Sequence, residues 1–204
     1  MTVIQEFLAG IFGNNPVFRL SLGLVPAIGV TAVALNGVFL GILTTVVLIA
    51  SLITAWILRH YVPEGSWQIM DIALLAVFTA LAQRILVLYY PVMVVELGIY
   101  IPLIVVNAFV LFRMEHNSKL TISIAQGLGM GIGFTLSLFI IGVVREFLGM
   151  GTLLGNTILS GNMPPFSLAA AVPGGFLILG LLLALVNAVF GSPQEVDEVG
   201  ADGQ

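Results

Sequence analysis

Ionisable side chains are scarce in this chain, and five of them fall inside or beside long apolar stretches: Asp71, Arg84, Glu96, Arg145 and Glu146. A charged group within a membrane segment is a candidate for an ion pathway. All five lie near the ends of apolar stretches, where a long side chain reaches the aqueous interface at low cost. Arg145 and Glu146 are adjacent, so on a helix they do not face each other and each needs a partner elsewhere.

No familiar catalytic or metal-binding pattern accompanies these charges. His60 and His116 have no second ligand at metal spacing, and the chain has no cysteine. The glycine-rich run at 127–133 lacks the strand and the Lys-Ser or Lys-Thr of a phosphate loop. The sequence therefore indicates one subunit of a membrane machine, or a transporter, rather than a complete enzyme.

Two proline-containing stretches interrupt apolar segments, LGLVPAIGVT at 22–31 and LGIYIPLIVVN at 97–107. Proline removes a backbone donor and clashes with the preceding turn, so each stretch should break its helix. Within hydrocarbon such a break persists only where protein or water covers it. Paired breaks predict a site at the middle of the membrane, which we assign to Gly23, Val25, Pro26, Thr31, Pro102, Asn107 and Ala108.

Composition fixes the class of protein. The chain of 204 residues is 59% hydrophobic and 8% charged, and its mean hydropathy is +1.16. Apolar runs of about 20 residues predict membrane-spanning helices rather than barrel strands. The lipid bilayer is therefore an expected partner, and nucleic acid is not, because no basic patch is present.

These runs predict an all-α integral membrane protein with six transmembrane helices, the first and fourth broken into half-helices. The spans are placed at about 17–34, 37–60, 68–90, 97–113, 121–148 and 168–190. Residues 1–15 are expected to form an interfacial segment, 16–190 the membrane domain, and 191–204 an acidic disordered tail. The Arg and Lys distribution favours cytoplasmic termini in a bacterial or archaeal inner membrane.

The two halves of the membrane domain, about 16–90 and 97–190, resemble each other. Five residues beyond Pro26 and Pro102 lie Thr31 and Asn107. Two triplets also share one spacing: Gly37, Gly41 and Thr45, and Gly127, Gly131 and Thr135. Because three spans per half is odd, a repeat of this kind must be inverted; chance is the alternative. The four glycines predict close helix packing, and Thr45, Thr135 and Glu146 are candidates for an ion path.

Several segments resemble one known family. NNPVFRLSLGLVPAIGVT (14–31), IPLIVVN (101–107), REFLGMGTL (145–153) and PGGFLILGLLLALVNAV (173–189) are similar to the E subunit of the Rnf (or Rsx) ion-translocating ferredoxin:NAD⁺ oxidoreductase. The D subunit of the sodium-pumping NADH:quinone reductase, Nqr, is its relative. The resemblance covers 14 to about 190. It implies a homologous six-span A-type partner of opposite orientation, further membrane and soluble redox subunits, and flavin and Fe–S groups in those subunits.

The resemblance also implies one [2Fe–2S] cluster, held at the midplane by two cysteines from each of the two homologous subunits. This chain departs from that pattern, since Val25 and Ala108 stand at the family's cysteine positions. A cluster is therefore expected to be absent, with no cofactor bound by this chain. The chain could be a divergent subunit with another electron route, a subunit that keeps scaffold and ion-path roles, or an engineered variant. The divergent 112–119 run favours natural divergence.

The leading hypothesis is thus a membrane subunit of an Rnf-like or Nqr-like complex that couples electron transfer to Na⁺ or H⁺ translocation. The alternatives are a self-contained secondary transporter with inverted repeats, and a redox-inert scaffold that docks soluble subunits through loops 59–67 and 113–120. Oligomer content distinguishes them, because a transporter should work as a homo-oligomer.

Overall fold

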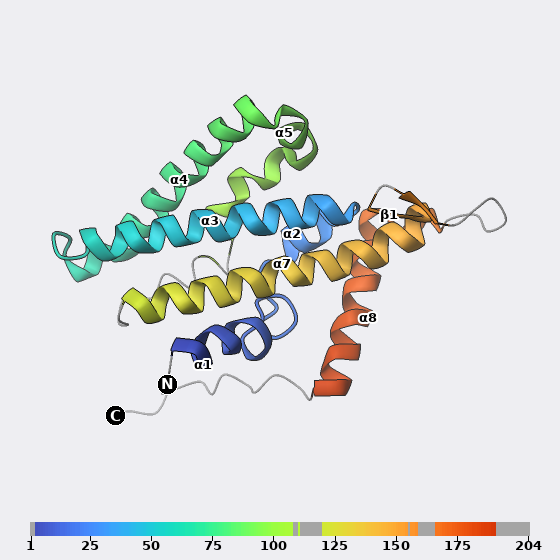
Figure 1. Ribbon diagram of the computed structural model, residues 1–204, viewed down its shortest axis with the longest axis horizontal. Coiled ribbons are helices and arrows are strands. Elements are labelled where there is room, and N and C mark those ends of the chain that lie inside the picture. Colours follow the sequence, from blue (N-terminus) through green and yellow to red (C-terminus); the bar gives the residue numbers. More distant parts are fainter. Residues whose placement is uncertain (1–2, 108–109, 111–119, 155, 159–165, 191–204) are drawn as a thin grey trace.

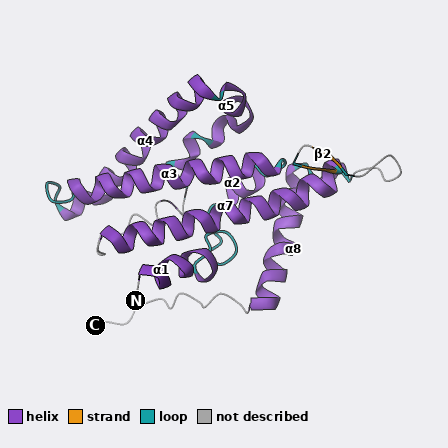
Figure 2. Ribbon diagram, in the orientation of Figure 1, coloured by secondary structure: helices purple, strands orange, loops and turns teal. Residues whose placement is uncertain are grey.

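Four long apolar helices dominate the computed structural model, which describes residues 3–107, 110, 120–154, 156–158 and 166–190 (Figures 1 and 2). They are α3 (Ala34–Leu58), α4 (Trp67–Tyr89), α7 (Leu120–Met150) and α8 (Val172–Phe190). By length and composition each could cross a membrane, which supports the predicted helical membrane class. They coincide closely with the second, third, fifth and sixth predicted spans.

The first and fourth predicted spans contain no long helix in the part of the chain that the structure describes. The first holds only α2 (Leu24–Gly29), which follows Gly23 in the left-handed conformation at φ +70°. Val33 is extended immediately before α3 begins. The fourth begins at the end of α5 (Pro91–Leu97), and its residues up to 107, which the structure describes, hold two 3-10 turns, η3 (Gly98–Tyr100) and η4 (Pro102–Ile104). The count of six spans stays a prediction.

The antiparallel pair α3 and α7 forms the core (Figure 1). A Cβ atom added at Gly41 would lie 2.6 Å from Thr135 Oγ1, and one at Gly131 would lie 2.5 Å from Thr45 Oγ1. These distances leave room for hydrogen only, so both contacts require glycine. At 31 residues, α7 is roughly 46 Å long, which exceeds a hydrocarbon core of about 30 Å.

The N-terminal segment packs on a second glycine ridge of α7. It consists of α1 (Val3–Leu8) and one turn of π-helix, η1 (Ala9–Gly13). An added Cβ at Gly10 would lie 2.7 Å from Met130 N, and one at Gly129 would lie 2.3 Å from Phe7 O. The segment therefore contacts α7 through its backbone, and its place at the membrane surface stays a prediction.

Beyond α7 the chain passes through a short hairpin and continues into α8. The hairpin pairs β1 (Thr152–Leu153) with β2 (Asn156–Thr157), and the 3-10 turn η5 (Ser167–Ala169) precedes α8. In Figure 1, α8 runs away from α7. Only 22% of the apolar window of α8 and 17% of that of α4 are buried, against 56% for α7, so both outer helices offer apolar surface to lipid or partners. The predicted tail 191–204 lies outside the described residues.

Candidate functional site

The two interrupted segments meet each other. An added Cβ at Gly23 would lie 3.2 Å from Asn107 Oδ1 and 2.8 Å from a ring carbon of Phe134. At the other end of α2, an added Cβ at Gly29 would lie 2.1 Å from the Tyr100 hydroxyl. Segments 23–29 and 100–107 therefore lie side by side, although about 75 residues of chain separate them.

This junction buries its polar side chains and exposes Val25. Thr31 is fully buried and Asn107 is 6% exposed, whereas the Val25 side chain is 66% exposed. Pro26 is buried and Pro102 is exposed. Ala108, the other position with a cysteine in the resembled family, lies outside the described residues.

Arg145 joins this junction to the start of α8. Its side chain is 1% exposed. Nη1 donates to Ile28 O at the end of α2 and to Thr31 Oγ1 at 2.8 Å. Nε donates to Ala169 O at 3.1 Å, and Nη2 donates at 2.9 and 3.3 Å to the next two carbonyl oxygens, of Ala170 and Ala171. One guanidinium thus binds carbonyl groups of two chain segments.

Glu146, the next residue on α7, binds the beginning of α3. Its Oε2 accepts the backbone N–H of Ala34 at 2.9 Å, and its Oε1 accepts the Thr152 hydroxyl at 3.2 Å. A carboxylate at a helix N-terminus is favourable because unpaired N–H groups and the helix dipole converge there. Glu146 is 1% exposed.

The expectation that both residues reach the interface by snorkelling is therefore wrong. Each is buried and bound to backbone groups of an interrupted segment, although each does find its partners elsewhere, as their adjacency predicts. Of the other three ionisable residues singled out in the sequence, Asp71 is 4% exposed, while Arg84 and Glu96 are exposed. The partners of Arg145 could not be read from the sequence, because backbone carbonyl groups carry no residue-type signal.

The candidate ion-path residues do not form one cluster. Thr45 and Thr135 lie in the α3–α7 contact, and each hydroxyl donates at 2.8 Å to a carbonyl four residues earlier, of Gly41 and Gly131 respectively. Glu146 binds the first residue of α3, eleven residues before Thr45, or roughly 16 Å along the helix. Gly37 faces Leu138 and Gly127 faces Leu52 in the same helix pair.

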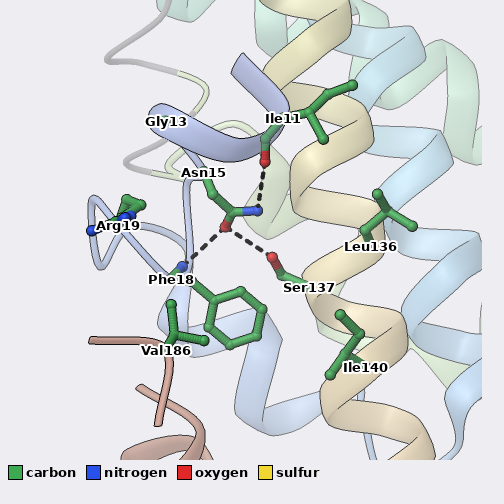
Figure 3. Close-up of a pocket in the computed structure, with 9 residues that line it drawn as sticks. All are labelled: Ile11, Gly13, Asn15, Phe18, Arg19, Leu136, Ser137, Ile140 and Val186. Carbon is green, nitrogen blue, oxygen red and sulfur yellow. Dashed lines mark hydrogen bonds between the residues drawn. The ribbon is translucent and has the colours of Figure 1, made fainter. Parts of the chain in front are cut away.

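A pocket of about 370 Å³ opens between the N-terminal segment, α7 and α8 (Figure 3). Its walls are mostly apolar, and no pattern in the sequence indicates it. Asn15 anchors one wall: Nδ2 donates to Ile11 O and Gly133 O, and Oδ1 accepts from two backbone N–H groups and from Ser137 Oγ at 2.8 Å. The Asn-Asn-Pro run signals a turn, but nothing in it reveals contacts 118 and 122 residues away.

The described residues do not fit the iron–sulfur cluster implied by the resemblance. The Val25 side chain has no atom that can bind iron, and the whole chain lacks cysteine. Among the described residues, no group of three or more His, Cys, Asp or Glu could hold a metal. We therefore derive no step through a cluster held by this chain.

Comparisons with known proteins agree with one another. Residues 3–183 match the Rnf-Nqr family, described as "Rnf-Nqr subunit, membrane protein". The E subunit of the Na⁺-translocating ferredoxin:NAD⁺ oxidoreductase complex of Acetobacterium woodii is 37% identical, over 92% of this chain and 97% of its own length. The E subunit of the proton-translocating complex of Clostridium ljungdahlii is 34% identical (89% and 86%). The E subunit of the ion-translocating oxidoreductase complex of Pseudoalteromonas atlantica is 40% identical (87% and 84%).

Proposed function

The chain belongs to the Rnf-Nqr family of membrane subunits, and from this premise we propose that it is the E-type subunit of an ion-translocating ferredoxin:NAD⁺ oxidoreductase complex. The observation that carries the proposal is similarity to E subunits over nearly the full length of both chains. Two relatives are named for different ions, Na⁺ and the proton, so the proposal covers either coupling ion.

Within that complex, the α2 junction is the surface that meets a homologous A-type subunit of opposite orientation. Two observations support this role: the exposed Val25 on α2, and an interrupted backbone, which lipid tolerates only under protein cover. The inverted repeat is supported by reciprocal contacts in the core. Gly41 faces Thr135 as Gly131 faces Thr45.

Electrons take a route in which this chain supplies no ligands. Flavin and Fe–S groups belong to partner subunits, while this chain contributes the packed α3–α7 core and the junction that shapes the middle of the membrane. We place it in the cytoplasmic membrane of a bacterium or archaeon with both termini in the cytoplasm.

Purification in mild detergent tests the proposal. A tagged chain should co-purify with a homologous six-span membrane subunit and with soluble redox subunits, and the preparation should couple ferredoxin oxidation to ion uptake in liposomes. A chain that purifies alone and transports a solute as a homo-oligomer would instead identify the secondary transporter.

A further inference from the structure

Adjacent residues of α7 hold both sides of the gap between α2 and α3. Helix α2 ends at Gly29 and α3 begins at Ala34. Arg145 binds Ile28 O and Thr31 Oγ1 on the first side of the gap, and Glu146 binds Ala34 N–H on the second. The cation thus meets the carbonyl end of one helix and the anion meets the amide end of the next, which is the favourable sign at both ends.

We propose that Arg145 and Glu146 are positioning residues, a two-residue clamp that sets the position of α2 and thereby the junction at which the chain contacts its partner. Consecutive residues on a helix point about 100° apart, so two neighbours reach opposite sides of a short gap without facing each other. The clamp deepens the proposed function, and its consequence for the partner contact rests on that proposal.

The clamp also fixes α2 relative to α8. Arg145 donates hydrogen bonds to three consecutive carbonyl oxygens just before α8, those of Ala169, Ala170 and Ala171. Gly175, on the first turns of α8, leaves the space that the guanidinium needs: an added Cβ would lie 3.0 Å from Arg145 Cζ and 3.1 Å from Ile28 Cγ2. A methyl group at this position would therefore press on both the clamp and α2.

Helix α8 supplies a matched control. A Cβ added at Gly180 meets nothing within 4 Å, so Gly175→Ala and Gly180→Ala make the same chemical change on one helix with and without contact to the clamp. The position of α2 can be followed through Ala27→Cys, because Ala27 is fully buried and the chain has no other cysteine. Maleimide label found on this subunit's band in a denaturing gel must then be on residue 27, so its rate of appearance measures how accessible α2 is.

The experiment measures the rate of N-ethylmaleimide labelling of Ala27→Cys in the assembled, purified complex. We expect slow labelling in the parent and with Gly180→Ala, and labelling several-fold faster with Gly175→Ala and with Arg145→Lys, since a lysine cannot span carbonyl groups of two segments. Glu146→Gln keeps an acceptor for Ala34 N–H and should show a smaller increase. Turnover of the assembled complex should fall in the same order.

Equal labelling rates in all variants would overturn the clamp, even if the yield of complex falls, because a general loss of stability lowers yield without moving α2 in the molecules that assemble. If the complex with Gly175→Ala fails to assemble, the labelling rate of Ala27→Cys in the Arg145→Lys variant tests the clamp instead. The partner contact is tested separately by a cross-linker at Val25. Faster Ala27→Cys labelling without any Val25 cross-link would keep the clamp and reject the proposed interface.

Discussion

The buried side-chain amide of Asn15 connects the N-terminal part of the chain to α7. It makes five hydrogen bonds and is 8% exposed. Two of them join it to Gly133 and Ser137 of α7, and three stay within residues 11–18. Its neighbour Asn14 is exposed. Similar residues next to each other thus have different roles, and the sequence alone does not distinguish them.

Replacing Asn15 should therefore destabilise the protein far more than replacing Asn14. Asn15→Ala leaves the backbone N–H groups of Val17 and Phe18 short of an acceptor and should cost about 2–4 kcal/mol. The apparent melting temperature of the purified complex should fall by several degrees, as followed by size-exclusion chromatography after heating. Asn14→Ala should leave it unchanged, and equal losses in the two variants would show that the Asn15 network does not stabilise the fold.

Val25 stands where the resembled family has a cysteine, so it provides a test of the predicted absence of a cluster. Iron and acid-labile sulfide per purified complex should be the same with Val25→Ala as in the parent, because the valine offers iron no ligand. The double variant Val25→Cys with Ala108→Cys, which restores the cysteines of the resembled family, should raise both values. Iron content that falls with Val25→Ala would contradict a cluster-free chain.

At the scale of elements, much of the fold follows from residue types. Long apolar runs locate α3, α4, α7 and α8 closely, and proline with glycine locates the interruptions near Pro26 and Pro102. The sequence does not reveal what satisfies the broken ends. The side chains of Arg145 and Glu146 do so by binding backbone carbonyl and amide groups, and such backbone groups look the same in every residue.

The α3–α7 contact provides a prediction at this scale. Gly41→Ala and Gly131→Ala each place a methyl group within 2.6 Å of a threonine, so the helices must separate, at a cost of about 1–3 kcal/mol. Because the two contacts are reciprocal, the two losses in melting temperature should be similar. Gly180→Ala, in open space, should cause no loss. Strongly unequal losses would argue against the internal repeat.

At the scale of the whole molecule, the chain exposes apolar surface both on its outer helices and at an interrupted segment. Outer helices α4 and α8 are largely unburied, and Val25 is 66% exposed where the backbone is interrupted. Lipid can cover a regular helix, but it cannot pair the polar groups of an interrupted one. Arg145 and Glu146 pair polar groups on both sides of the gap, and the proposed function still needs a partner subunit to cover the exposed Val25.

A photo-activated cross-linker such as p-benzoylphenylalanine, introduced at Val25 in the membrane-embedded complex, tests this need most directly. Irradiation should join the chain to a second membrane subunit of the same family, identified by mass spectrometry, whereas the same cross-linker at exposed Ile69 on α4 should not capture that subunit. Cross-links from Val25 to lipid alone would contradict the proposed function, because they would show that no partner subunit covers α2 at Val25.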